Sequence, residues 1–192
     1  MAYLIAALLL FLGGHSLRIF AEGWRAAQLQ RLGALGWMAL HGLVSLISFA
    51  LLVWAYGAAR GSGLLWAAPA WGRGLATLLT LAAFILIVAA YVPRNRLQAR
   101  LGHPMALGVA LWAVAHLLVH PSPAGLLLFG AFFAWACLSF RAGRGRDRSA
   151  GIRRQAGPLI LDVIVAGAGV AVWGAFLLFL HQPLIGISAL AG

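Results

Sequence analysis

The feature that most constrains this chain is a series of long apolar runs that alternate with short segments rich in arginine. A helix needs about 20 residues to cross a hydrocarbon core of roughly 30 Å. Six runs approach or exceed that length, and they predict membrane-spanning helices at residues 2–20, 35–59, 74–93, 104–120, 124–141 and 158–181. The expected fold class is therefore all-α: residues 1–192 form one polytopic transmembrane helix bundle with about six spans.

The composition excludes a water-soluble globule. Hydrophobic residues make up 64% of the chain and charged residues 9%, with a mean hydropathy of +0.97, whereas soluble domains carry about 25% charged residues. The first run has no basic segment before it and no small-residue cleavage site after it. We therefore expect it to remain as a helix and not to serve as a removed signal peptide.

The arginines predict the orientation of the bundle. All fourteen basic residues are arginine; twelve of them fall in the first, third and fifth segments between the runs, and only Arg60 and Arg73 fall on the other side. The positive-inside rule places the three arginine-rich segments in the cytoplasm and both termini outside. Because these arginines lie between helices and form no patch interleaved with aromatic residues, the net charge of +11 does not indicate nucleic-acid binding.

Three other features are explained by membrane structure without a special function. The segment "RAGRGRDRSAGIRR", at 141–154, is expected to be the most mobile part and to anchor the topology, although anionic lipid headgroups or a soluble partner remain alternatives. Small residues at 166–175 favour close helix packing. Asp162 lies near the start of the last run, where an ion pair with a loop arginine would dock that helix.

The histidines are the main candidates for a functional site, because polar groups within apolar helices are costly and often functional. Those expected on the cytoplasmic side are His15, His41 and His103, and those on the outer side are His116, His120 and His181. His15 and His116 lie deepest and are expected to act as ligands. The other four histidines are expected near the membrane interfaces. We expect structural roles for His41 and His120, and we keep His103 and His181 as second choices for ligands.

His116 shares one helix face with three notable residues, Gly108, Trp112 and His120. A glycine, an indole and an imidazole in one stripe indicate room for a flat ligand. Neutral imidazole suits haem iron, zinc or copper. Cys137 is the single cysteine and no Cys-x-x-Cys-His motif is present, so any haem is held without a covalent link. The motifs of nucleophilic and hydrolytic enzymes are absent as well.

Four segments, "GHSLRIF", "AAYVPRNRLQARLGHPMALGVALWAVAHLL", "RDRSAG" and "FLHQPLIG", resemble the NnrU family of bacterial inner-membrane proteins. The same arrangement of His-Ser, His-Pro and Ala-His is similar to the plant 15-cis-zeta-carotene isomerase, a membrane haem b protein with two histidine ligands. The resemblance implies haem b bound by His15 and His116. Around such a haem, Arg18 and Arg96, together with Arg94 and Arg100, are expected to pair with the propionates or to anchor helix ends, and Trp112 to stack near the macrocycle or simply to pack.

The resemblance implies a function in nitrite and nitric oxide metabolism, in the bacterial inner (cytoplasmic) membrane. Two alternatives stay open: a haem-dependent cis–trans isomerase of carotenoid-like polyenes, and a non-enzymatic assembly factor for denitrification reductases. Whether the chain is an enzyme is thus open, as is its oligomeric state. The expected partners are the lipid bilayer, haem, and nitric oxide or a hydrophobic small molecule.

Two features oppose parts of this interpretation. The segment "LGHP" has Gly102 where the isomerase and related membrane methyltransferases have arginine, and Asp162 is the only acid after residue 150, which disfavours a methyltransferase. The second feature is depth in the membrane: helix geometry places His15 and His116 roughly 12 Å apart along the membrane normal. Depth alone prefers His15 with His103, or His116 with His181. Two haems, one near each membrane face, would also remove the conflict.

Overall fold

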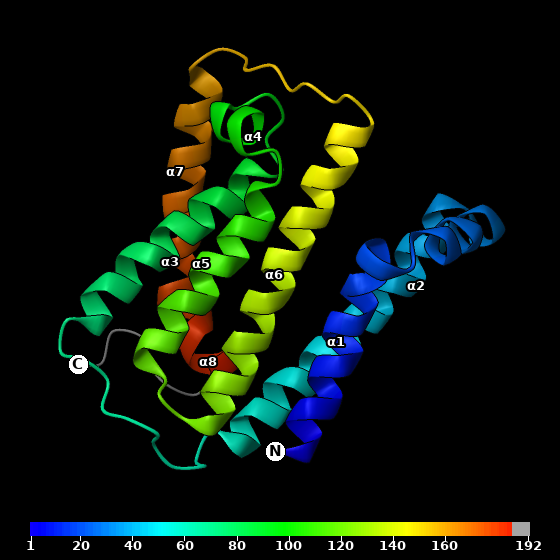
Figure 1. Cartoon of the computed structure of the whole chain (residues 1–192). Coiled ribbons are helices and arrows are strands. Elements are labelled where there is room, and N and C mark those ends of the chain that lie inside the picture. Colours follow the sequence, from blue (N-terminus) through cyan, green and yellow to red (C-terminus); the bar gives the residue numbers. More distant parts are fainter. Residues whose placement is uncertain (186–192) are drawn as a thin grey trace.

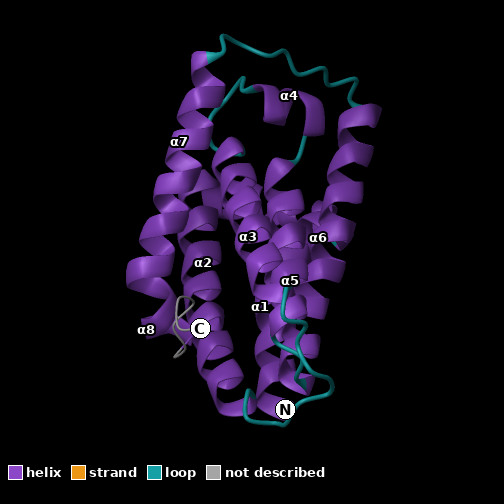
Figure 2. Ribbon diagram, turned by 90° about the vertical axis from the view of Figure 1, so that its left-hand side faces the viewer, coloured by secondary structure: helices purple, strands orange, loops and turns teal. Residues whose placement is uncertain are grey.

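The computed structural model describes residues 1–185, and within this range every regular element is a helix (Figures 1 and 2). The prediction of an all-α, multi-pass membrane protein is therefore confirmed. Five helical segments are long and apolar enough to cross a membrane, and a shorter apolar helix lies where the fourth span was expected. The predicted location of the C-terminus concerns residues 186–192, which lie outside the described residues.

The apolar helices follow the predicted order. They are α1 (Ala2–Phe20), α2 (Glu22–Ala59), α3 (Gly72–Ala89), α5 (Pro104–Val119), α6 (Pro123–Ser149) and α7 (Ile160–Ala175). A π-helical turn, η1 (Phe176–Leu180), continues α7 into the short α8 (His181–Ile185). The short α4 (Arg96–Leu101) lies between α3 and α5. Ser122 caps α6 by accepting a hydrogen bond from the backbone of Gly125, which closes the tight turn predicted after α5.

Two boundaries differ from the prediction by more than four residues. Helical structure begins at Glu22 and not at residue 35, and it is interrupted at Gly33, whose φ of 69° is a left-handed conformation that glycine adopts without strain. The turns of α2 before residue 35 contain charged residues, so they do not form part of an apolar run. In the same way, α6 continues to Ser149 through much of the arginine-rich segment that was predicted to be a loop.

The helices pack as a series of neighbours in the order α7, α3, α5, α6, α1 and α2. Glycines permit the closest approaches: a Cβ on Gly108 would lie 2.8 Å from the carbonyl oxygen of Ala83, and one on Gly169 would lie 2.7 Å from the Cα of Ile85. The packing role predicted for the small residues of 166–175 is thus confirmed at Gly169. The interpretation of Gly108 as room for a flat ligand is wrong, because α3 occupies that space.

The two ends of the bundle differ in packing and charge. A buried apolar cluster joins the start of α1 to the end of α2 and the start of α6, through Leu4, Tyr56 and Phe129 among others. The opposite end, which we call the arginine-rich end, holds the last turns of α1 and α6 together with α4 and the start of α7 (Figure 1). The backbone of Arg96 there donates to Asp162 Oδ1 at 2.7 Å, and its side chain forms an ion pair with the same carboxylate. The predicted docking of the last span by an arginine–Asp162 pair is thereby confirmed.

Candidate functional site

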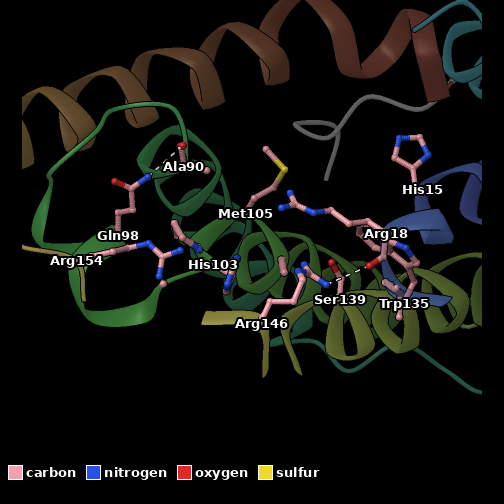
Figure 3. A pocket seen from close by; sticks show the side chains of 14 residues that line it. His15, Arg18, Ala90, Gln98, His103, Met105, Trp135, Ser139, Arg146 and Arg154 are labelled. Atoms are coloured by element: carbon pink, nitrogen blue, oxygen red, sulfur yellow. Dashed lines mark hydrogen bonds between the residues drawn. The ribbon is translucent and has the colours of Figure 1, made fainter. Parts of the chain in front are cut away.

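A cavity of about 420 Å³ lies at the arginine-rich end, between the last turns of α1, the start of α5 and the second half of α6 (Figure 3). Its polar lining comes from residues far apart in the sequence: His15, Arg18, Gln98, His103, Ser139, Arg146 and Arg154. Pro104, Met105 and Ala106 contribute apolar surface. The cavity therefore combines imidazoles, guanidinium groups and an apolar wall.

His15 enters this cavity from α1 with its tautomer fixed. Its Nδ1 lies 2.7 Å from the carbonyl oxygen of Phe11. Because a carbonyl oxygen only accepts hydrogen bonds, Nδ1 carries the proton and Nε2 keeps a free lone pair. The ring stacks on Phe11 with 4.3 Å between centroids and lies 5.4 Å from the ring of His41. An imidazole held in this way is suited to bind a metal through Nε2.

His116 has the same internal geometry in α5. Its Nδ1 lies 2.8 Å from the carbonyl oxygen of Trp112, so Nε2 is again the free nitrogen. Aromatic rings surround it, with centroid distances of 4.8 Å to Trp112, 4.7 Å to Phe129 and 5.7 Å to His120. Trp112 also packs against Phe129 and Phe132, so ordinary packing explains its position.

His103 has a different environment, in which its ring is enclosed by groups of the protein. Its Nε2 lies 3.0 Å from Asp147 Oδ2, outside hydrogen-bond geometry, and a Cβ on Gly143 would lie 2.7 Å from the ring. Gly102, which precedes His103, has a φ of 78°. A Cβ added to Gly102 would lie 3.3 Å from Oδ2 of Asp147. The glycine in "LGHP" thus makes room for the Asp147–Arg154 pair that faces His103.

His116 does not line the cavity that contains His15. A chain of ring contacts links the two histidines through Phe11, Phe132 and Trp112, with successive centroid distances of 5.7 and 5.4 Å between these three rings. His15 shares its cavity with His103, the pairing that the expected depths of the histidines favoured. His181 is buried at the start of α8. In residues 1–185, no three His, Cys, Asp or Glu side chains form a metal-binding group.

The arginines divide between the cavity and its surroundings. Arg18 lines the cavity, whereas Arg96 does not line it and pairs with Asp162, with 3.5 Å between Nε and Oδ2. Arg146 and Arg154 were not among the residues predicted for the site. A helical pattern was available for Arg146, because Trp135, Ser139 and Arg146 recur at spacings of four and seven on one face of α6. Arg154 follows the helix, and no pattern marks it.

A comparison with protein families identifies the chain. A family model described as "NnrU protein" matches residues 3–189, nearly the whole sequence. The chain belongs to the NnrU family. No curated protein and no solved structure matches it. Three of the segments that suggested NnrU meet at the cavity: "GHSLRIF" provides Arg18, "LQARLGHP" provides Gln98 and His103, and "RDRSAG" provides Arg146.

Proposed function

We propose that this NnrU protein binds haem b in the bacterial inner membrane and acts in nitrite and nitric oxide metabolism, with His15 and His116 as iron ligands. The observation that supports this most strongly is the shared geometry of the two histidines. Each places its Nδ1 within hydrogen-bond distance of the carbonyl four residues earlier in its own helix. Such backbone bonds fix ring orientation and tautomer in metal-binding histidines, and they leave both Nε2 atoms available.

The surroundings of these residues suit a flat, largely apolar cofactor. Phe129, Phe132 and Trp112 provide aromatic surface near His116, and Phe11 provides it near His15. A haem iron with an open coordination position binds nitric oxide, or acts as a Lewis acid toward an unsaturated hydrocarbon, depending on the polarity of the pocket. One haem between the two histidines would require the rings of Phe11, Phe132 and Trp112 to move.

The charge distribution supports the proposed orientation. Twelve of the fourteen arginines fall at or near the α1–α2, α3–α5 and α6–α7 connections, and by the positive-inside rule this bias supports a cytoplasmic arginine-rich end with the N-terminus in the periplasm. The cavity with His15 and Arg18 then opens near the cytoplasmic membrane face. His116, in the last turn of α5, lies toward the periplasmic side.

The test is the absorption spectrum of the detergent-purified protein, oxidised and dithionite-reduced, with haem quantified as pyridine haemochrome. We expect a b-type Soret band that is lost or shifted in His15→Ala and in His116→Ala. His120→Ala, which removes a neighbouring imidazole in contact with His116 and Phe129, is the matched control and should keep the band.

The same preparation distinguishes the alternatives. A wild-type protein that is colourless and cannot be reconstituted with haem would overturn the proposal. A ratio of one haem per chain would exclude the arrangement with two haems. With haem present, a spectral change on adding nitric oxide supports the proposed setting, whereas turnover of a cis-polyene such as 15-cis-zeta-carotene would favour the isomerase instead.

A further inference from the structure

The arginines that line the cavity are not all neutralised by the acids of the chain. The sequence contains three acidic side chains, and each is paired: Glu22 with Arg25 at 2.9 Å, Asp162 with Arg96 at 3.5 Å, and Asp147 with Arg154. Of the cavity arginines, Arg154 is thus compensated. Arg18 and Arg146 have no carboxylate within 4 Å among the described residues.

Arg146 is fixed across the cavity and does not extend freely into solvent. It is half-buried on α6, and its Nη1 donates to the backbone oxygen of Arg18 at 3.1 Å, so that it joins α6 to the end of α1 (Figure 3). A guanidinium group has five N–H donors, and this bond uses one. Two cationic side chains from different helices, Arg18 and Arg146, therefore line the same cavity.

The remaining polar lining also favours an anion. Trp135 lines the cavity, and its indole Nε1 is buried without a hydrogen-bond partner among residues 1–185, while Ser139 adds a hydroxyl and Gln98 an amide whose nitrogen donates to the carbonyl oxygen of Ala90. Indole and guanidinium groups donate hydrogen bonds and accept none. A set of donors with unbalanced positive charge, next to an apolar wall, fits a negatively charged group on an apolar body.

From this arrangement we infer that the cavity binds the acidic group, a carboxylate or a phosphate, of an amphiphile in the membrane, through Arg18 and Arg146. Two sources present this chemistry: the propionates of a haem bound at His15, and the phosphate of an anionic phospholipid. His15 and Arg18 are three residues apart, about 4.5 Å along the helix axis, so one ligand can reach both. The haem source rests on the proposed function, whereas the phospholipid source does not.

The test compares Arg146→Gln with Arg148→Gln. Both variants remove one positive charge from the end of α6, but Arg148 is exposed and does not line this cavity. The purified proteins are titrated with haemin and with haemin dimethyl ester, followed at the Soret band. Loss of a charge-assisted hydrogen bond should weaken haemin binding roughly tenfold in Arg146→Gln, and it should leave binding of the ester unchanged. Arg148→Gln should change neither.

A second measurement detects the phospholipid source. The same proteins are placed in nanodiscs with equal phosphatidylglycerol and phosphatidylcholine, and the lipids that remain bound are counted by native mass spectrometry. Arg146→Gln should lose retained phosphatidylglycerol that the wild type and Arg148→Gln keep. Arg18→Gln, which keeps the backbone oxygen bonded to Arg146, serves as the second site variant should Arg146→Gln fail to fold.

The outcomes separate the two hypotheses. A defect of the site variants with haemin but not its ester identifies the propionates, and a defect confined to phosphatidylglycerol identifies a lipid headgroup. If wild type binds no haem, the proposed function fails and the lipid measurement alone decides the present inference. Equal haemin affinity and equal lipid retention in all variants would overturn the acidic-group site.

Discussion

Asp147 is held at close range by a guanidinium and an imidazole. It lies in the arginine-rich last turns of α6, beyond the apolar part of that helix, and forms two hydrogen bonds with Arg154 while His103 Nε2 lies 3.0 Å away. The hydrogen bond from Arg154 holds the pKa of the Asp147 carboxyl below its usual range. Ionised Asp147 therefore stabilises the folded chain at neutral pH.

Replacing this carboxylate should remove a contribution to the free energy of unfolding that depends on pH. Because the pKa is lowered on folding, the contribution is complete above the unfolded value of about 3.9 and is lost as pH falls through the folded value. Asp147→Asn should lower the thermal midpoint at pH 7 by roughly 2–4 °C, which corresponds to about 1 kcal/mol. As pH falls through the folded pKa, the midpoints of the variant and wild type should converge.

The measurement is the unfolding midpoint in detergent between about pH 2 and 7. Glu22→Gln is the control, because the Glu22 side chain is 46% exposed and exposed ion pairs contribute little. A constant difference between Asp147→Asn and wild type over this whole range would contradict the assigned role of the carboxylate.

Sequence alone located the candidate site only in part. His15 and Arg18 were identified because they fall in or beside an apolar run, where polar residues are conspicuous. Arg146 was missed because the surrounding arginines look alike in the sequence, and only the direction of α6 turns one of them toward α1. The environment of His103 likewise depends on Asp147, which is 44 residues further along the chain.

At the scale of helices, the crossing of α3 and α5 depends on Gly108. We expect Gly108→Ala to lower the free energy of unfolding by about 1–3 kcal/mol. The added Cβ would lie 2.8 Å from the carbonyl oxygen of Ala83, so the backbone of α3 or α5 would have to shift. The unfolding midpoint measures the loss. Gly130→Ala, where nothing lies within 4 Å of the added Cβ, should be neutral or stabilising, and equal midpoints for the two variants would argue against the close crossing.

The helices were predictable where hydrophobicity alone decides them. The first run coincides with α1 and the fourth nearly with α5, since lipid-exposed segments must be both apolar and helical. Polar helices escape this rule. Residues 22–32 and the end of α6 are helical although they are charged, and helices of this kind depend on local hydrogen bonding and packing, which an apolar run does not reveal.

For the molecule as a whole, the separation of arginines makes the orientation testable. In a Cys137→Ser background, Ser62→Cys places a thiol in the exposed connection between α2 and α3, and Ser149→Cys places one at the arginine-rich end. With a membrane-impermeant maleimide on intact spheroplasts, we expect labelling of Ser62→Cys at once and of Ser149→Cys only after permeabilisation. The reverse pattern would invert the topology.

The buried cluster encloses the start of α1, so any tilt of this helix relative to the bundle would turn about this cluster. Leu4 and Leu8 are enclosed there, whereas at the far end one hydrogen bond from Arg146 reaches α1. His15 lies seven residues beyond Leu8 and eleven beyond Leu4, which places it roughly 13 Å along the helix axis from the midpoint of these two residues. A rotation of about ten degrees at the cluster would carry the imidazole sideways by roughly 2 Å over this lever arm, while the apolar contacts at its base stay closed.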